Sequence, residues 1–226
     1  MPSDSFVWDV ALPERRQGAF GAARPRATLR VSSPQEGDET ISLPLGVGKI
    51  LKAKHDSGEA NPASRGELMF LVRELSARCA ATRIELLVNK RDYSQRELDD
   101  KLRADGYSSS VREQCLGRAI DCGLVSDQRY AAAFIRTKVS SGWGSQRIER
   151  ELKRRGIEPS DVSGWPDEFF SGESEEERAY AVARTRRLAQ RNGYEKLVRF
   201  LCGRGFGLST SMRVARRVVD ESNAGA

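Results

Sequence analysis

The pattern of apolar and polar positions occurs three times along the chain, at a spacing of about fifty residues. Segments 94–107, 144–157 and 193–206 superimpose without a gap. In each, two apolar residues stand four positions apart, which gives a short helix one buried stripe. These pairs are Leu98 and Leu102, Ile148 and Leu152, and Leu197 and Leu201. The repetition predicts three helices of one design.

Residues suited to helix ends flank each of these helices. Ser94, Gly144 and Gly193 stand where an N-cap is expected. At the other end, a glycine able to adopt the left-handed C-cap conformation is followed by a large apolar residue that can fold back on the last turn. These pairs are Gly106 and Tyr107, Gly156 and Ile157, and Gly205 and Phe206.

Further apolar positions keep the same register on both sides of each helix. Upstream, the matching positions are Ala80 and Ile84, Tyr130 and Phe134, and Ala179 and Ala183. Downstream, helical spacing is clear in 111–120 and 209–219 and weaker in 160–170. Because a unit of this size buries little core alone, we expect neighbouring units to pack on each other. The predicted fold is all-α, an elongated and curved tandem array of three three-helix repeats.

The same pattern divides the chain into four segments. Residues 1–63 hold most of the prolines and lack sustained periodicity, so we expect a poorly ordered, flexible extension, in which 27–32 and 39–45 could pair as a short hairpin. A capping box at Ser64 then starts a lead helix and the first repeat, together 64–124. The second repeat is assigned to 125–170 and the third to 171–222.

Positive charge is concentrated in the second and third repeats, although the net charge is only +6. From Arg178 to Arg217 the basic residues are opposed only by Glu195, and from Arg129 to Arg155 only by Glu149 and Glu151. A cationic surface attracts polyanions, so nucleic acid or a protein that coats it is the expected class of partner. For part of the basic residues in the second repeat there is a simpler explanation, namely that they form i,i+4 ion pairs along their own helix.

We nominate twelve residues of these repeats for contact with a partner or with DNA. Trp143, between two glycines, is either packed against the adjoining helix or an exposed ring that stacks on a partner. The nominated residues are Arg129, Arg136, Trp143, Arg147, Arg150, Arg154, Arg184, Arg187, Arg204, Arg213, Arg216 and Arg217.

Several other classes of protein do not fit this sequence. No apolar run approaches the roughly twenty residues of a membrane span, and the first residues lack a signal-peptide core, so we expect a cytoplasmic protein. The four cysteines lack paired C-x-x-C spacing and the only histidine is His55, so no metal site is expected. With no phosphate-binding loop and no catalytic constellation either, we expect a protein without enzymatic activity and without a cofactor.

Three motifs, in order, resemble the RecX family of bacterial recombination regulators. RDYSQREL is similar to the family's R-x-x-S-x-x-E-L signature through Arg91, Ser94, Glu97 and Leu98. GLVSDQRYA (123–131) is similar to the family's glycine, apolar, acidic, arginine and aromatic pattern. GWGSQRIERELKRRGI (142–157) resembles its central segment. The resemblance covers roughly residues 68 to 220.

The resemblance implies a regulator of homologous recombination and of the SOS response. Such a protein binds RecA and RecA-coated single-stranded DNA, and inhibits filament growth, ATP hydrolysis, strand exchange and coprotease activity. We expect a monomer with weak non-specific DNA binding at most. Two alternatives stay open: a helix-turn-helix-like DNA-binding transcriptional regulator, and a helical scaffold that recruits acidic proteins.

Overall fold

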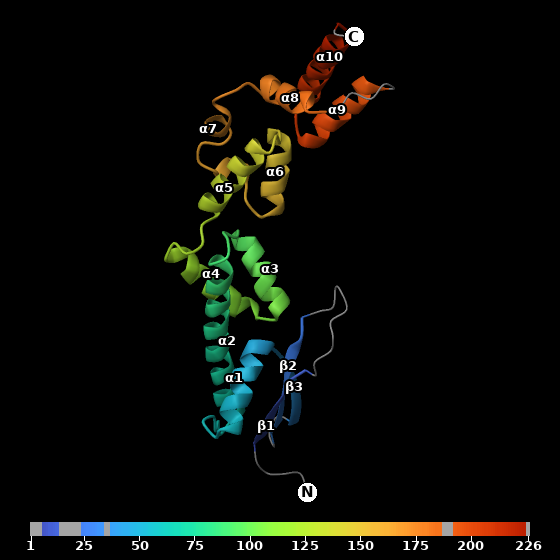
Figure 1. Ribbon diagram of the computed structural model, residues 1–226. Coiled ribbons are helices and arrows are strands. Elements are labelled where there is room, and N and C mark those ends of the chain that lie inside the picture. Colours follow the sequence, from blue (N-terminus) through green and yellow to red (C-terminus); the bar gives the residue numbers. More distant parts are fainter. Residues whose placement is uncertain (1–5, 14–23, 34–36, 187–191, 225–226) are drawn as a thin grey trace. The chain divides into compact units, whose positions relative to one another are not determined.

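The computed structural model describes residues 6–13, 24–33, 37–186 and 192–224. It is mostly helical, as the sequence predicts, and the chain divides into two compact units, Met1–Val125 and Ser126–Ala226 (Figure 1). Each unit has its own buried core.

The first unit begins with a three-stranded antiparallel sheet in the order β1 (Val7–Ala11), β2 (Arg26–Ser33), β3 (Gly37–Pro44). The β2–β3 pair is the hairpin expected from the sequence, with Leu29 opposite Ile41. Alternate residues of β2 are buried, because successive side chains of a strand point to opposite faces.

Helix α1 (Leu45–Asp56) follows directly and lies between the sheet and α2 (Arg65–Val88) (Figure 1). Val47 and Leu51 are fully buried there. Gly48 lies so close to the strand that an added β-carbon would overlap the Ala27 side chain. The described part of 1–63 is therefore a packed layer, which is more order than the flexible extension expected from the sequence. The helix is hard to recognise because two glycines interrupt its apolar pattern.

Three helices complete the first unit as the first repeat. They are α2, α3 (Gln95–Asp105) and α4 (Ser109–Asp121). Helix α3 begins at a complete capping box between Ser94 and Glu97 and ends at Gly106 in the left-handed conformation, as its sequence predicts. Its buried Leu98 and Leu102 join the same core as the sheet.

The second repeat opens the second unit with α5 (Asp127–Ser140) and α6 (Ser145–Arg154). In place of a full third helix, the chain forms the 3₁₀ turn η1 (Pro159–Asp161) and the four-residue α7 (Asp167–Phe170). The prolines and the left-handed Gly164 in this stretch explain why the helix is interrupted. Ile135, Ile148 and Leu152 form the centre of the core of this repeat.

The third repeat contains α8 (Glu175–Arg184), α9 (Gly193–Arg204) and α10 (Leu208–Ala224). Helix α8 starts at a capping box between Ser174 and Glu177. The N-cap of α9 is Asn192, one residue before the glycine expected from the alignment. Leu201, Phe206 and Val214 are buried between the three helices.

Candidate partner interface

The second and third repeats meet through the main chain, where the end of α9 reaches the start of α6. The Gly144 amide donates to the carbonyl oxygen of Arg204 at 2.9 Å, and the Gln146 amide donates to that of Gly205 at 3.3 Å. Amides at a helix N-terminus and carbonyls at a helix C-terminus have no partner inside their own helix. Here the two helix ends satisfy each other, with the partial positive end of one dipole against the partial negative end of the other.

Glycine is required at this contact, which we call the α6–α9 joint. A β-carbon on Gly144 would overlap the Gly205 carbonyl group, and one on Gly205 would overlap Arg147. A β-carbon on Gly142 would meet Val182 at 2.6 Å. The sequence predicts Gly144 and Gly205 as helix caps, and the structure adds that both allow two backbones to touch.

Three arginine side chains hold the joint from both sides. Arg147 Nη1 donates to the carbonyl oxygen of Gly203 at 3.2 Å, and Arg204 Nη1 donates to that of Ser141 at 3.0 Å. Arg178 Nη2 donates to the carbonyl oxygen of Trp143 at 2.9 Å. Burial lowers the pKa of the Arg178 guanidinium. Two of the nominated residues, Arg147 and Arg204, therefore bind the protein's own backbone.

The Trp143 ring is half-buried in the same joint. It meets Phe134 edge to face at a centroid distance of 6.5 Å, and the Arg147 guanidinium lies 3.8 Å from its centroid. Lys138 also approaches the ring, at 4.9 Å. Of the two arrangements considered for Trp143, the structure shows the packed one.

The other nominated arginines lie on exposed positions of four helices. Arg129 and Arg136 are on α5, Arg150 and Arg154 on α6, Arg184 on α8, and Arg213, Arg216 and Arg217 on α10. Arg187 lies outside the described residues. The structure thus separates the nominated set into joint residues and surface residues, a distinction that the sequence does not make.

Acidic neighbours neutralise several of the surface arginines. Arg154 pairs with Glu151 at 2.8 Å, while Arg213 pairs with Glu176 and Arg217 with Glu221, both at 3.0 Å. Glu176 and Glu221 lie just outside the 178–217 stretch, so the charges counted along that stretch do not reveal these two pairs.

The Glu221 carboxylate accepts hydrogen bonds from the Tyr180 hydroxyl and from Arg217, which lower its pKa. In contrast, no described acid pairs with the exposed Arg150 or Arg216.

A shallow groove of about 580 Å³ runs along α9 and α10. Its lining combines apolar, basic and acidic side chains. They are Tyr194, Met212, Arg213, Arg216, Arg217, Asp220 and Glu221. Tyr194 and Met212 were not nominated, although the helical spacing of α10 already places Met212 away from its core positions.

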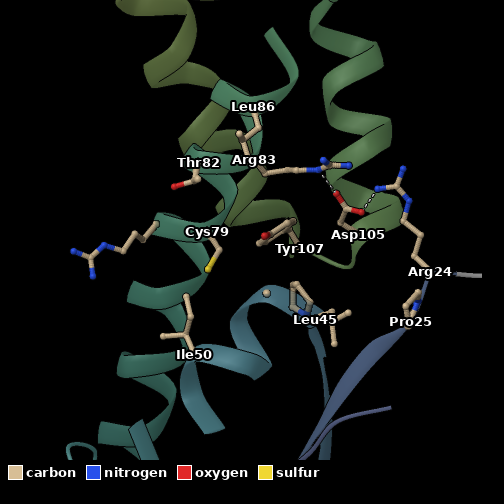
Figure 2. Close-up of a pocket in the computed structure, with 13 residues that line it drawn as sticks. Arg24, Pro25, Leu45, Ile50, Cys79, Thr82, Arg83, Leu86, Asp105 and Tyr107 are labelled. Atoms are coloured by element: carbon tan, nitrogen blue, oxygen red, sulfur yellow. Dashed lines mark hydrogen bonds and ion pairs between the residues drawn. The ribbon is translucent and has the colours of Figure 1, made fainter. Parts of the chain in front are cut away.

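The first unit has a pocket of about 470 Å³ where the sheet, α1, α2 and the end of α3 meet. Figure 2 shows Arg24 and Arg83 approaching Asp105 from different sides, with Tyr107 beside Cys79. The Arg83–Asp105 distance is 3.0 Å. Burial raises the pKa of the Tyr107 phenol and of the Cys79 thiol, so both are neutral near pH 7. None of the nominated residues lies here.

The second repeat, in particular, has counterparts among known proteins. A family model described as RecX, second three-helix domain, matches residues 126–163, which hold α5, α6 and η1. The Regulatory protein RecX of Vibrio vulnificus is 35% identical over 134 residues, covering 57% of this chain and 84% of that protein. The chain belongs to the RecX family. The Regulatory protein RecX of Pseudomonas syringae pv. tomato is 32% identical, covering 53% of this chain and 87% of that protein.

Two crystal structures of RecX proteins share the fold. The structure from Lactobacillus salivarius has a TM-score of 0.51 at 18% identity and covers 63% of this chain and 96% of that chain. A second, described as regulatory protein RecX, has a TM-score of 0.54 at 16% identity and covers 91% of this chain and 96% of that chain. The larger coverage exceeds what residues 64–226 can supply, so part of the N-terminal layer also has a structural counterpart in a RecX protein.

Proposed function

We propose that this RecX family chain regulates the RecA recombinase. It binds RecA and the RecA-coated single-stranded DNA filament and restrains filament growth, ATP hydrolysis, strand exchange and coprotease activity. Through these effects it regulates recombinational repair and the SOS response in the cytoplasm, as a monomer and without catalysis or a cofactor. Among the described residues no helix is long and apolar enough to cross a bilayer.

The observation that carries this proposal is the set of exposed arginines on two repeats that are joined through their main chains. Arg150 on α6 and Arg216 on α10 have no acidic partner among the described residues, so their charge is available to a polyanion. A filament of nucleic acid and protein offers phosphates and carboxylates together. The joint holds α6 against α9, and α9 packs against α10, so both helices that carry this charge belong to one unit.

The geometry disfavours the helix-turn-helix alternative for the second repeat. A recognition helix of that class contacts base edges with its N-terminal residues. In this chain the N-terminal end of α6 is covered by the end of α9, which accepts hydrogen bonds from Gly144 and Gln146. Sequence-specific reading of duplex DNA by α6 would require the joint to open.

The test is cosedimentation of the full chain with RecA, with single-stranded DNA, and with both. The wild-type chain should pellet with the RecA–DNA filament and lower its rate of ATP hydrolysis. The double variant Arg150→Glu, Arg154→Glu should bind the filament about tenfold or more weakly, because both substitutions place an acid on the exposed face of α6. Full inhibition by this variant would contradict the role given to α6.

A matched control reverses two charges in the first unit. Lys90 and Arg96 are exposed, and Lys90→Glu, Arg96→Glu makes the same change in net charge. This control should inhibit RecA as the wild-type chain does. If both double variants lost filament binding to the same extent, net charge, and not the face of α6, would govern binding. A preference for one duplex sequence at constant salt would favour the DNA-binding regulator instead.

A further inference from the structure

The outer face of α10 carries an apolar stripe that the core does not use. Val214, Ala215 and Val218 face the interior of the third repeat. At the edge of this buried face, in the first turns of the helix, Leu208 is 63% exposed and Met212 is 46% exposed. They stand four residues apart, so they lie on one face of the helix, and Arg216 continues the same line. Two neighbouring exposed apolar side chains become informative where they border a groove, because apolar patches next to grooves are typical of binding sites.

The α9–α10 groove runs beside this stripe. Tyr194 from α9 and Met212 from α10 give it an apolar part, and Arg216 is its one cation without an acidic partner among the described residues. The other two lining arginines are neutralised, Arg213 by Glu176 and Arg217 by Glu221.

This balance of charge does not suit a phosphate backbone. Arg216 alone can neutralise one anionic group, and Asp220 and Glu221 also line the groove, so a run of successive phosphodiesters would meet too little positive charge there. Tyrosine, methionine and arginine are instead the side chains enriched where proteins bind proteins. The chemistry therefore favours a polypeptide over a nucleic acid at this site.

We propose that the α9–α10 groove, with Leu208 beside it, docks a protein segment that carries a bulky apolar side chain and a carboxylate about one helical turn, roughly 6 Å, away. The apolar side chain packs against Met212 and Tyr194, and the carboxylate pairs with Arg216. The inference rests on the proposed function, because the segment belongs to the protein part of the filament and not to its DNA. It separates the protein contact on α10 from the polyanion contact on α6.

The experiment measures three affinities for each variant at constant salt: for RecA without DNA, for single-stranded DNA alone, and for the filament. Met212→Glu and Arg216→Glu should each weaken binding to free RecA about tenfold or more, because each removes one anchor of the groove. Binding to single-stranded DNA alone should change by less than about twofold. Met212→Ala provides a milder second variant, in which no charge enters the groove.

The control is Lys196→Glu, which reverses an exposed charge on α9 outside the groove lining. It should bind RecA as the wild-type chain does. Circular dichroism and thermal unfolding of each variant should match the wild type, since Met212 and Arg216 are exposed.

The outcomes distinguish this inference from the proposed function. If the wild-type chain binds neither free RecA nor the filament, the proposed function fails. If it binds both and the groove variants bind equally well, only the docking surface is wrong. Loss of DNA affinity with unchanged RecA affinity would identify a nucleic-acid surface. A wild-type dimer that Met212→Glu converts to a monomer in sedimentation would identify a second copy of the chain as the occupant. Either of these last two results overturns the inference.

Discussion

Gly144 at the start of α6 and Gly205 at the end of α9 are in backbone contact, with no space for a side chain on either residue. Gly144 also donates its amide to the neighbouring carbonyl of Arg204 at 2.9 Å. Because the contact joins two different repeats, through residues about sixty positions apart in sequence, its strength should determine whether the second unit behaves as one body.

Gly144→Ala should destabilise the second unit by about 1–3 kcal/mol, since the added methyl group forces the two backbones apart. Urea unfolding followed by tryptophan fluorescence, with Trp8 of the first unit replaced by Phe in both proteins, leaves Trp143 and Trp165 to report on the second unit. Gly203→Ala is the matched control: Gly203 lies inside α9 with open space around its α-carbon, and alanine favours a helix by up to about 1 kcal/mol. Equal stability of the two variants would show that the close approach is not required.

Trp143→Ala should lower the stability of the second unit by about 2 kcal/mol, less than for a fully buried ring, because Trp143 keeps part of its surface exposed. The variant loses contact with Phe134 and with the Arg147 guanidinium. Circular dichroism during urea unfolding measures this change. Affinity for RecA, measured where the variant is fully folded, should stay within about twofold of wild type. A folded variant of normal stability that binds poorly would instead assign the ring to partner contact.

Stability of the second repeat should depend on pH through Glu151. Its hydrogen bond from Arg155 lowers its pKa below the ordinary value of 4.5. The resulting stabilisation is fully present above that ordinary value and is lost as the pH falls through the lowered pKa of the folded state. Glu151→Gln should therefore be less stable than wild type by about 0.5–1 kcal/mol at pH 7.

The free energy of unfolding should differ less between Glu151→Gln and wild type as the pH of the measurement is lowered below 4.5. Glu149→Gln is the control, because the pairs of Glu151 with Arg154 and Arg155 remain in that variant. A difference in unfolding free energy that stays constant down to pH 3 would contradict the claim that the ionised Glu151 carboxylate stabilises the second repeat.

Asp105→Asn should loosen the N-terminal layer, because the Asp105 carboxylate pairs with Arg24, two residues before β2, and with Arg83 on α2. We expect a loss of about 1 kcal/mol and faster hydrogen exchange in peptides from β1 and β2. Asp100→Asn removes only an exposed pair with Arg103 and should leave exchange in the sheet unchanged. Unaltered exchange in Asp105→Asn would show that the sheet is held by its apolar contacts alone.

The helices of the repeats could be predicted because their determinants are local. Leu98 with Leu102, and the Ser94–Glu97 capping box, are all within one short segment, and the structure has each where the spacing indicates. The third element of the second repeat was the weakest prediction, and there prolines and a glycine replace a helix by η1 and α7.

The role of individual arginines could not be predicted, because their partners are distant in sequence. Arg147 and Arg150 are three residues apart and look alike, yet Arg147 donates to the Gly203 carbonyl while Arg150 is exposed. The carbonyl oxygen is a group that every residue has, so no residue type in the sequence signals the contact. Sequence alone therefore overestimates the number of arginines available to a partner.

The N-terminal layer was underestimated for a related reason. Its strand β1 has five residues and buries only Trp8 and Val10, which is too short a pattern to stand out. Helix α1 depends on Gly48 fitting against Ala27, a relation visible only when strand and helix are placed together. The β2–β3 hairpin was expected because both strands and their turn are contiguous.

The contact at the α6–α9 joint is made largely by peptide groups. It therefore does not depend on which side chains point outward from α6 and α10. Mutation can exchange the cations and apolar residues there, and selection can adjust them to a changing partner, while the two repeats stay attached. At the joint itself Gly142, Gly144 and Gly205 cannot be exchanged in this way, because any larger residue there would collide with the neighbouring repeat.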